Sequence, residues 1–383
     1  MHRVLNLPIT VDLKTRTLPE EPNVFLVRPG ASYHLYDQIL DESAIAVDIP
    51  FLEVPDGRPI PEASEIQPML ERGRELRSWA AKSSRTRGRQ PSTSLDAYRT
   101  FLDDRGPKMA RTKLRNAANT VLWKIPDNSL LFIPASTLGG KAILAEAGRR
   151  SAPRRRMNGS GTRARMEYLG RPIVEPKLVP MRDLPSDVTD PGQKLLVHDS
   201  FEGYAKERLL RAYYGDYSRG ANVNVVEFVA GADEFDTKVI AQISALAMSI
   251  EHFLDTRQFL HPQEFVFGHP EIRGPQLHAR INSPDGKAQV QDNTLVPHTV
   301  KLFLLFAGSN LAVAVITAHL MATDVSVTNS EIQGGGEIAE ATQAALIDYA
   351  AAAGADSMSS IIENLRASSE RTEGEVDGRV DGP

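Results

Sequence analysis

Short apolar runs and helical periodicities alternate near the start of the chain. Residues 23–28 form an apolar run that closes at Pro29-Gly30, residues 33–42 follow a helical spacing, and residues 44–49 are apolar again. Short apolar runs bounded by turn-forming residues are typical of buried strands. The pattern therefore predicts a strand, a helix and a second strand, preceded by an extended arm at residues 1–22.

A longer helix is expected after this opening. Residues 55–61 are proline-rich and predict a loop. Residues 65–81 place Ile66, Leu70 and Leu76 on one helical face with arginines opposite. The polar, basic residues 82–94 that follow indicate an exposed linker or a flexible insertion.

A β-hairpin is expected in the middle of the chain. Residues 120–125 and 129–133 flank the turn-forming triplet Pro126-Asp127-Asn128. Residues 141–147 predict a third strand or a short helix. Residues 149–165 combine arginines with glycine and proline, which predicts a strongly basic loop.

The second half begins with a predicted helix at residues 204–214 and a strand at 222–230. Residues 235–260 carry apolar side chains at helical spacing and predict a long helix with a core-facing stripe. From residue 337 an alanine-rich helical stretch is interrupted at Gly354. It leads into residues 370–383, an acidic end that we expect to be disordered.

One stretch has to be considered as a membrane span. In residues 302–322 the only ionisable side chain is His319, and about 20 uncharged residues suffice to cross a bilayer. The turn-forming Gly308-Ser309-Asn310 lies in its middle, and β-branched residues are frequent after it. These features favour a buried hairpin, and we expect no membrane association.

These patterns predict an α+β fold with two domains, mixed sheets and flanking helices. The boundary between the domains is expected near Pro191-Gly192. The predicted parts are an arm (1–22), a basic nucleic-acid-binding domain (23–190) with an insertion (55–109), an assembly or effector domain (191–366) and an acidic tail (367–383).

Composition narrows the class of protein. The chain has 383 residues, of which 41% are hydrophobic and 24% charged, and it has no cysteine. It therefore has no disulfide and no thiolate ligand or nucleophile, which fits a reducing compartment. Residues 1–16 lack the apolar core of a signal peptide. We expect a cytoplasmic protein, or a virion component if it is encoded by a phage.

Charge is segregated along the chain. The net charge is −5, yet residues 72–171 hold 23 Lys and Arg against 7 Asp and Glu, and the remainder holds 21 against 42. A concentrated positive potential attracts polyanions even when the whole molecule is acidic. Nucleic acid, DNA in the first place, is the expected partner; the alternative is a basic face that docks on an acidic one.

Arginines in two predicted loops are the candidate nucleic-acid contacts. Trp79, Trp123 and Tyr168 lie in the same part of the chain, where aromatic side chains stack on bases or fill the core. The candidate arginines are Arg85, Arg87, Arg89, Arg149, Arg150, Arg154, Arg155, Arg156, Arg163 and Arg165.

Signatures of catalysis are sparse. The chain lacks a phosphate-binding glycine loop with its lysine, a His-Glu-x-x-His motif and a Gly-x-Ser-x-Gly motif. Asp127 together with Glu175 and Lys177 matches the outline of a Mg²⁺-dependent nuclease, in which carboxylates hold the metal and lysine stabilises the developing charge. Pro176 interrupts the strand that this arrangement needs. A surface ion pair explains the same residues.

No metal site and no cofactor are expected. His252, His261, His269 and His278 lie close in sequence, but their spacing places them on no common helical face.

A family resemblance agrees with the charge pattern. The stretch from Val24 to Gly30, the helix with Tyr36 and Leu40 and the strand after it resemble the N-terminal module of some Mrr-like restriction proteins. The stretch from Tyr168 to Pro185 resembles the end of that module. The resemblance covers about the first half of the chain and implies a nucleic-acid-sensing part attached to a variable effector. The insertion at 55–109 and the lack of a nuclease core in the second half depart from it.

Three functional hypotheses follow. The first is a non-catalytic DNA-associated binding protein of a bacterial or phage system, whose second half mediates homo-oligomeric or larger assembly. The second is a structural subunit of a phage virion or other large particle. The third is a Mg²⁺-dependent, restriction-like nuclease.

Overall fold

The computed structural model describes most of the chain, and every structural statement below concerns these residues. The described ranges are 8–30, 33–62, 65–99, 109–184, 197–198, 201–219, 223–229, 237–268, 276–280, 287–292, 299–330, 336–372 and 379–381.

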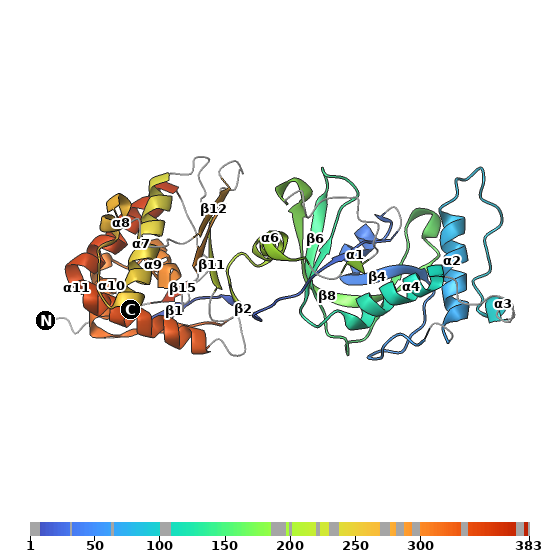
Figure 1. The fold of residues 1–383 in the computed structure, drawn as a ribbon, viewed down its shortest axis with the longest axis horizontal. Coiled ribbons are helices and arrows are strands. Elements are labelled where there is room, and N and C mark those ends of the chain that lie inside the picture. The colour runs from blue at the N-terminus through green and yellow to red at the C-terminus, as the bar shows by residue number, and fades with distance from the viewer. Residues whose placement is uncertain are drawn as a thin grey trace. The chain divides into compact units, whose positions relative to one another are not determined.

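The chain forms two compact units, each of which contains helices and β-sheet (Figure 1). One unit consists of residues 22–213, and the other combines residues 1–21 with residues 214–383. The predicted α+β class is confirmed. The domain boundary expected near Pro191-Gly192 falls on residues outside the described part, whereas the units divide at Tyr213/Tyr214.

The unit of residues 22–213 is built on one mixed sheet with the strand order β4-β8-β6-β5-β3-β9, in which β7 also pairs with β8. The pair β3·β5 is parallel and the other pairs are antiparallel. The strands are β3 (Val24–Val27), β4 (Ala44–Pro50), β5 (Leu130–Ile133), β6 (Lys141–Ala147), β7 (Arg155–Asn158), β8 (Glu167–Pro180) and β9 (Val197–His198).

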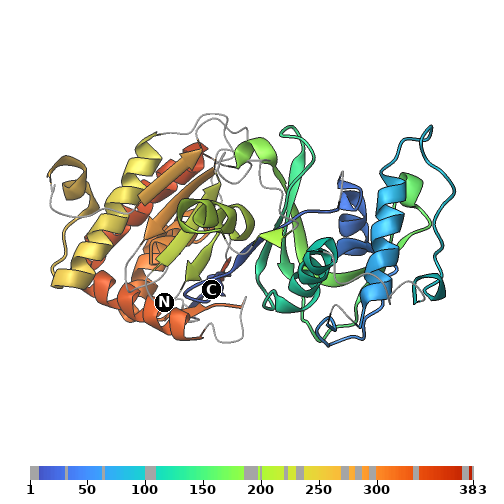
Figure 2. The ribbon, with the colours of Figure 1, turned by 45° about the vertical axis from the view of Figure 1, so that its right-hand side comes forward.

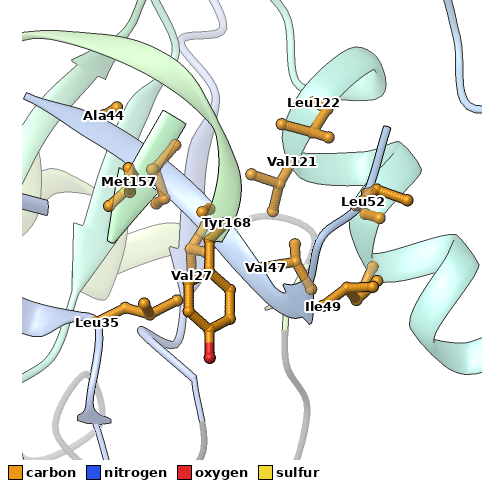
Figure 3. Packing of buried hydrophobic residues seen from close by; sticks show 14 of the residues in the cluster. Val27, Leu35, Ala44, Val47, Ile49, Leu52, Val121, Leu122, Met157 and Tyr168 are labelled. Carbon is orange, nitrogen blue, oxygen red and sulfur yellow. The ribbon is translucent and has the colours of Figure 1, made fainter. Parts of the chain in front are cut away.

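Helices cover this sheet and close its core. Strand β4 is buried along its whole length, and the apolar side chains around it pack against Val121 and Leu122, which are 0% and 1% exposed (Figure 3). This continuous apolar burial is the main stabilising term of the unit. The helices are α1 (Tyr36–Glu42), α2 (Gln67–Ala80), α3 (Asp96–Arg99), α4 (Met109–Asn119), the π-helical turn η2 (Thr120–Lys124), the short helices η3 (Gly161–Arg163) and η4 (Met181–Asp183), and α6 (Gly203–Tyr214).

The second unit contains two small sheets. Strand β1 lies between β14 and β15, and the other sheet has the order β12-β13-β11-β10-β2 (Figure 2). The predicted arm thus supplies two strands to this unit. The strands are β1 (Ile9–Asp12), β2 (Arg16–Leu18), β10 (Tyr217–Arg219), β11 (Val223–Val229), β12 (Gln276–Arg280), β13 (Lys287–Asp292), β14 (Val325–Thr328) and β15 (Arg379–Asp381).

Helices pack on these sheets around an apolar core that includes Tyr349 and Phe303. Within the core, Lys301 is fully buried, forms an ion pair with Asp216 and donates to Thr15 Oγ1 at 3.2 Å. A buried charge needs such a paired and hydrogen-bonded setting. The helices are α7 (Thr237–Thr256), α8 (Pro262–Gly268), α9 (Thr299–Gly308), α10 (Val313–Ala322) and α11 (Gly336–Thr372).

Several predicted elements are confirmed. The opening strand, helix and strand are β3, α1 and β4, and the next predicted helix is α2. The long apolar helix of the second half is α7, and residues 141–147 form a strand. The interruption at Gly354 is confirmed by its non-helical φ of 75° and ψ of 166°.

The hairpin predicted across residues 120–133 is wrong in its first half. Residues 120–124 form the π-helical turn η2, and β5 pairs with β6 and β3. The run that suggested a strand continues helix α4, because Val121 and Leu122 bury their side chains in the core from a helical backbone.

Residues 302–307 are buried and residues 308–322 are partly buried, but the expected strands are helices. Helices α9 and α10 are 10 residues each, and the predicted turn lies between them. The side chains of α9 and, from α10, Ile316 and Leu320 pack in the core of the second unit, so helix packing overrides the β-branched composition of α10. Among the described residues, no helix combines the length and apolar character needed to cross a membrane.

Two segments expected to be irregular contain strands. In the predicted basic loop, residues 155–158 form β7 against β8. In the predicted acidic tail, residues 379–381 form β15 against β1, and α11 runs as far as Thr372. The pairing of β15 is not visible in the local pattern, because its partner β1 lies near the other end of the sequence.

Candidate nucleic-acid interface

Three segments of the first unit meet at one basic corner. We use this name for the residues Arg58, Lys124, Arg149, Arg150 and Arg154. The guanidinium of Arg154 donates to the carbonyl of Arg58 at 2.6 Å, and that of Arg150 lies 5.8 Å from the ring centre of Trp123, the neighbour of Lys124. These contacts bring residues 54–58, 123–127 and 149–154 together.

The two carboxylates at the basic corner are both engaged by the chain itself. Asp127 Oδ1 accepts from the backbone N and Nε of Arg150, at 2.9 and 3.2 Å, and from Nη2 of Arg171 at 2.8 Å. Asp56 Oδ1 accepts the backbone N–H of Arg154 at 2.9 Å. The basic corner therefore has an excess of positive charge: its five cations and the underlying Arg171 outnumber the carboxylates of Asp56 and Asp127.

Arg58, Lys124 and Arg149 are exposed, and each of the three lacks an ion pair within the described part of the chain. Exposed cations in such a cluster repel one another and gain from an external anion. They are the groups of the basic corner that are best placed for a ligand.

Arg171 lies beneath these residues and is 2% exposed. It donates to the carbonyls of Gly148 and Ile125 at 2.9 and 2.7 Å. Burial lowers the pKa of Arg171 to about 10, Asp127 opposes this shift, and the nearby Arg150 and Arg154 add to it. Arg171 is therefore charged at neutral pH and contributes to the positive potential from inside.

Residues 82–94, predicted to be an exposed linker or a flexible insertion, form a mostly exposed loop after α2. The guanidinium of Arg87 donates to the carbonyl of Lys82 at 2.7 Å and lies 5.2 Å from the ring centre of Trp79, whose Nε1–H donates to the carbonyl of Gly88 at 2.8 Å. Arg87 thus anchors the loop. Arg85 and Arg89 are exposed and, among the described residues, form no ion pair.

The arginines around β7 differ in their roles. Arg155 donates to the carbonyl of Glu42, and Arg156 pairs with Glu167. Both side chains are exposed. Arg165 is exposed as well and forms no ion pair with another described residue.

Arg163 is not a surface residue, because it is only 5% exposed. Its Nη1 lies 3.0 Å from Asp48 Oδ1, Arg77 Nε lies 3.0 Å from Asp48 Oδ2, and His34 Nε2 lies 3.4 Å from Asp48 Oδ1. Burial alone raises the pKa of Asp48, but the hydrogen bond to His34 and the charges of Arg77, His34 and Arg163 lower it to about 2. This cluster anchors strand β4 to η3 and α2.

The candidate nuclease residues have other partners in the structure. Asp127 binds Arg150 and Arg171, and Lys177 Nζ donates to the carbonyl of Tyr213 at 2.8 Å. Glu175 lies at a register shift of β8 with a φ of 48°, and this β-bulge lies about 13 Å along the strand from Arg171 at ~3.3 Å per residue. Among the described residues no group of three His, Asp or Glu side chains is placed to hold a metal ion.

Two residues of the basic corner, Arg58 and Lys124, are absent from the sequence-based candidates. Both are single cations in segments that otherwise looked like a proline-rich loop and a strand. Local charge density cannot reveal them, because only the folded chain brings them next to Arg149 and Arg154.

Comparison of the chain with protein-family models, curated protein sequences and solved structures finds no match.

Proposed function

We propose that this protein binds the phosphate backbone of a nucleic acid through the basic corner. The observation that carries the proposal is the charge of this site. Asp127 is paired with Arg150 and Arg171, and Asp56 accepts the backbone N–H of Arg154, while Arg58, Lys124 and Arg149 are exposed and have no ion pair within the described residues.

The charge of the whole unit supports the same ligand class. Residues 22–213 hold 31 Lys and Arg against 23 Asp and Glu, whereas the other unit is acidic. A polyanion releases condensed counterions when cations replace them, so a cluster of exposed cations favours nucleic acid over small anions. The other unit is assigned to assembly in this proposal, as a homo-oligomer or within a larger particle.

Salt dependence of binding tests the proposal. Fluorescence anisotropy with labelled oligonucleotides measures affinity between about 50 and 200 mM salt. In the double variant Lys124→Gln/Arg149→Gln, we expect weaker binding and a salt slope that is smaller by about 1.4 to 1.8, because two phosphate contacts are lost at ~0.7 to 0.9 each.

The chain offers a matched control. Lys141 and Arg182 are exposed and lie at the other end of the β6–β8 pair, about 20 Å from the corner along β6 at ~3.3 Å per residue. Lys141→Gln/Arg182→Gln removes the same charges, and we expect it to keep the salt slope of the original protein. Equal losses in both double variants would contradict a localised site.

The alternative functions give different results in the same preparation. Indifference to nucleic acid combined with concentration-dependent association in sedimentation would favour a structural subunit. Mg²⁺-dependent cleavage that disappears in Glu175→Ala would favour a nuclease. Retention of nucleic acid without cleavage is the result that we expect.

A further inference from the structure

Trp123 lies in an unusual backbone segment at the edge of the basic corner. Helix α4 ends in the π-helical turn η2, which spans five residues and contains Trp123 and Lys124. π-Helical turns are rare and occur frequently at functional sites, because the wider turn changes the direction of side chains. Here the turn places an aromatic ring and a cation side by side in sequence.

The turn is fixed by core packing and by a backbone hydrogen bond. Val121 and Leu122 are 0% and 1% exposed and pack in the core of the unit (Figure 3). The backbone of Ile125 donates to the carbonyl of Thr120 at 2.9 Å and closes the turn. A ring on this segment therefore loses little conformational entropy when a ligand contacts it.

The indole of Trp123 is half-buried, and its N–H group can still donate a hydrogen bond to a ligand. Its Nε1–H donates no hydrogen bond to any described residue and is not buried, so it is open to solvent. The guanidinium of Arg150 lies 5.8 Å from the ring centre. A ring beside cations is the combination with which proteins hold unpaired bases.

The other two candidate aromatic residues lie outside the basic corner and have other partners. Trp79 donates to the carbonyl of Gly88 and lies beneath Arg87. Tyr168 is 0% exposed and packs against His34 with ring centres 5.5 Å apart. Trp79 is half-buried like Trp123, but of the three aromatic residues only Trp123 lies beside a cation of the basic corner.

We propose that Trp123 stacks on an unpaired base, so that the ligand of the basic corner is single-stranded nucleic acid. The inference rests on the proposed function and adds the class of nucleic acid. In a duplex the bases stack on each other, and a ring on the protein surface reaches phosphates and sugars only. In a single strand each base has a free face, and cations next to the ring hold the adjoining phosphates.

Measuring the affinity of the protein for three polyanions distinguishes the contribution of base stacking from that of charge. The ligands are a labelled single-stranded oligonucleotide, the duplex of the same sequence and inorganic polyphosphate, which has no bases. We expect Trp123→Ala to weaken single-strand binding by about 5- to 100-fold. Binding of polyphosphate and duplex stays unchanged, and Trp123→Phe, which keeps a stacking ring, loses less than Trp123→Ala.

Photocrosslinking tests the contact without any substitution. A single-stranded oligonucleotide that carries 5-iodouracil is irradiated on the unaltered protein, and crosslinked tryptic peptides are identified by mass spectrometry. Cleavage after Arg115 and Lys124 releases residues 116–124, in which Trp123 is the only aromatic residue. A crosslink in this peptide supports stacking, and crosslinks confined to other peptides overturn it.

The outcomes distinguish the two proposals. If the protein binds all three polyanions with equal response to Trp123→Ala, the single-strand inference fails while the basic corner stands. If the unaltered protein binds none of them at low salt, both proposals fail.

Discussion

Asp48 and Asp127 each hold two arginine side chains in the unit of residues 22–213. Asp48 pairs with Arg77 and Arg163, and Asp127 pairs with Arg150 and Arg171. Asp48 is 1% exposed, whereas the side chain of Asp127 is 34% exposed. The carboxylate of Asp48 therefore affects the stability of the fold, whereas that of Asp127 also affects the electrostatic potential at the surface that a ligand contacts.

Asp48→Asn is expected to lower the free energy of unfolding by about 3 to 5 kcal/mol at neutral pH, because two guanidinium groups lose their buried counter-charge. The folded-state pKa of Asp48 is about 2, below its ordinary value of 3.8. The carboxylate thus stabilises the fold above the higher value and stops doing so as the pH falls through the lower one. In urea unfolding, the difference in the free energy of unfolding between Asp48→Asn and the original protein should shrink as the pH falls from about 4 to about 2. A difference that is constant with pH would contradict the assignment.

Asp127→Asn is expected to raise nucleic-acid affinity by about 1.5- to 5-fold, since it removes a partly exposed negative charge next to cations that face the ligand. Anisotropy at low salt measures this gain. Asp96→Asn is a suitable control, because Asp96 is exposed on α3 and pairs only with Arg99 among the described residues. A loss of affinity in Asp127→Asn would contradict the proposed role of the carboxylate.

Helix ends and interruptions shape the second unit. Arg366 on α11 donates to carbonyls at the end of α9 and in the turn after it, and these backbone groups have no partner within the helix. Gly354 divides α11 with a backbone conformation that other residues rarely adopt. The carbonyls that Arg366 contacts belong to Phe306, Ala307, Ser309 and Leu311, at 3.3, 3.3, 3.1 and 2.6 Å.

Gly354→Ala is expected to cost about 1 to 3 kcal/mol, because alanine at a φ of 75° is strained. The added methyl group meets no atom within 4 Å, so the cost arises from the backbone alone. Gly308→Ala is the matched control, since this position is equally open and lies in a helix without a positive φ. In thermal unfolding, the melting temperature of Gly308→Ala should equal or exceed that of the original protein. Equal destabilisation by both changes would contradict the argument.

Each unit has its own apolar core, and the start of the chain belongs to the core of the unit that also contains its end. Ile9, Val11 and Leu13 are all 0% exposed in that core. Both tryptophans of the chain lie in the other unit. Tryptophan fluorescence therefore reports on residues 22–213 alone.

Deletion of residues 2–13 is expected to unfold the second unit and leave the first intact. The loss of three buried apolar side chains, about 5 to 9 kcal/mol, approaches the whole stability of a domain. Hydrogen exchange should show α9 and α11 unprotected, while the fluorescence transition persists. Deletion of residues 2–7, which keeps β1, serves as the control. Loss of the fluorescence transition in the longer deletion would contradict independent cores.

The sequence predicted those elements whose signal is local. Strand β4, helix α2 and helix α7 follow from apolar spacing, and the break in α11 follows from a glycine. The concentration of cations in residues 72–171 was also apparent from the sequence, because net charge does not depend on the fold.

Tertiary structure decided which of those cations face solvent. Arg163 and Arg171 became buried partners of carboxylates, whereas Arg58 and Lys124 joined the basic corner. Packing likewise turned residues 120–124 into a π-helical turn and residues 379–381 into a strand beside residues near the start of the chain. The reason is physical: burial and pairing depend on groups that are distant in sequence, and a periodic pattern records only the face of an element, without its partner.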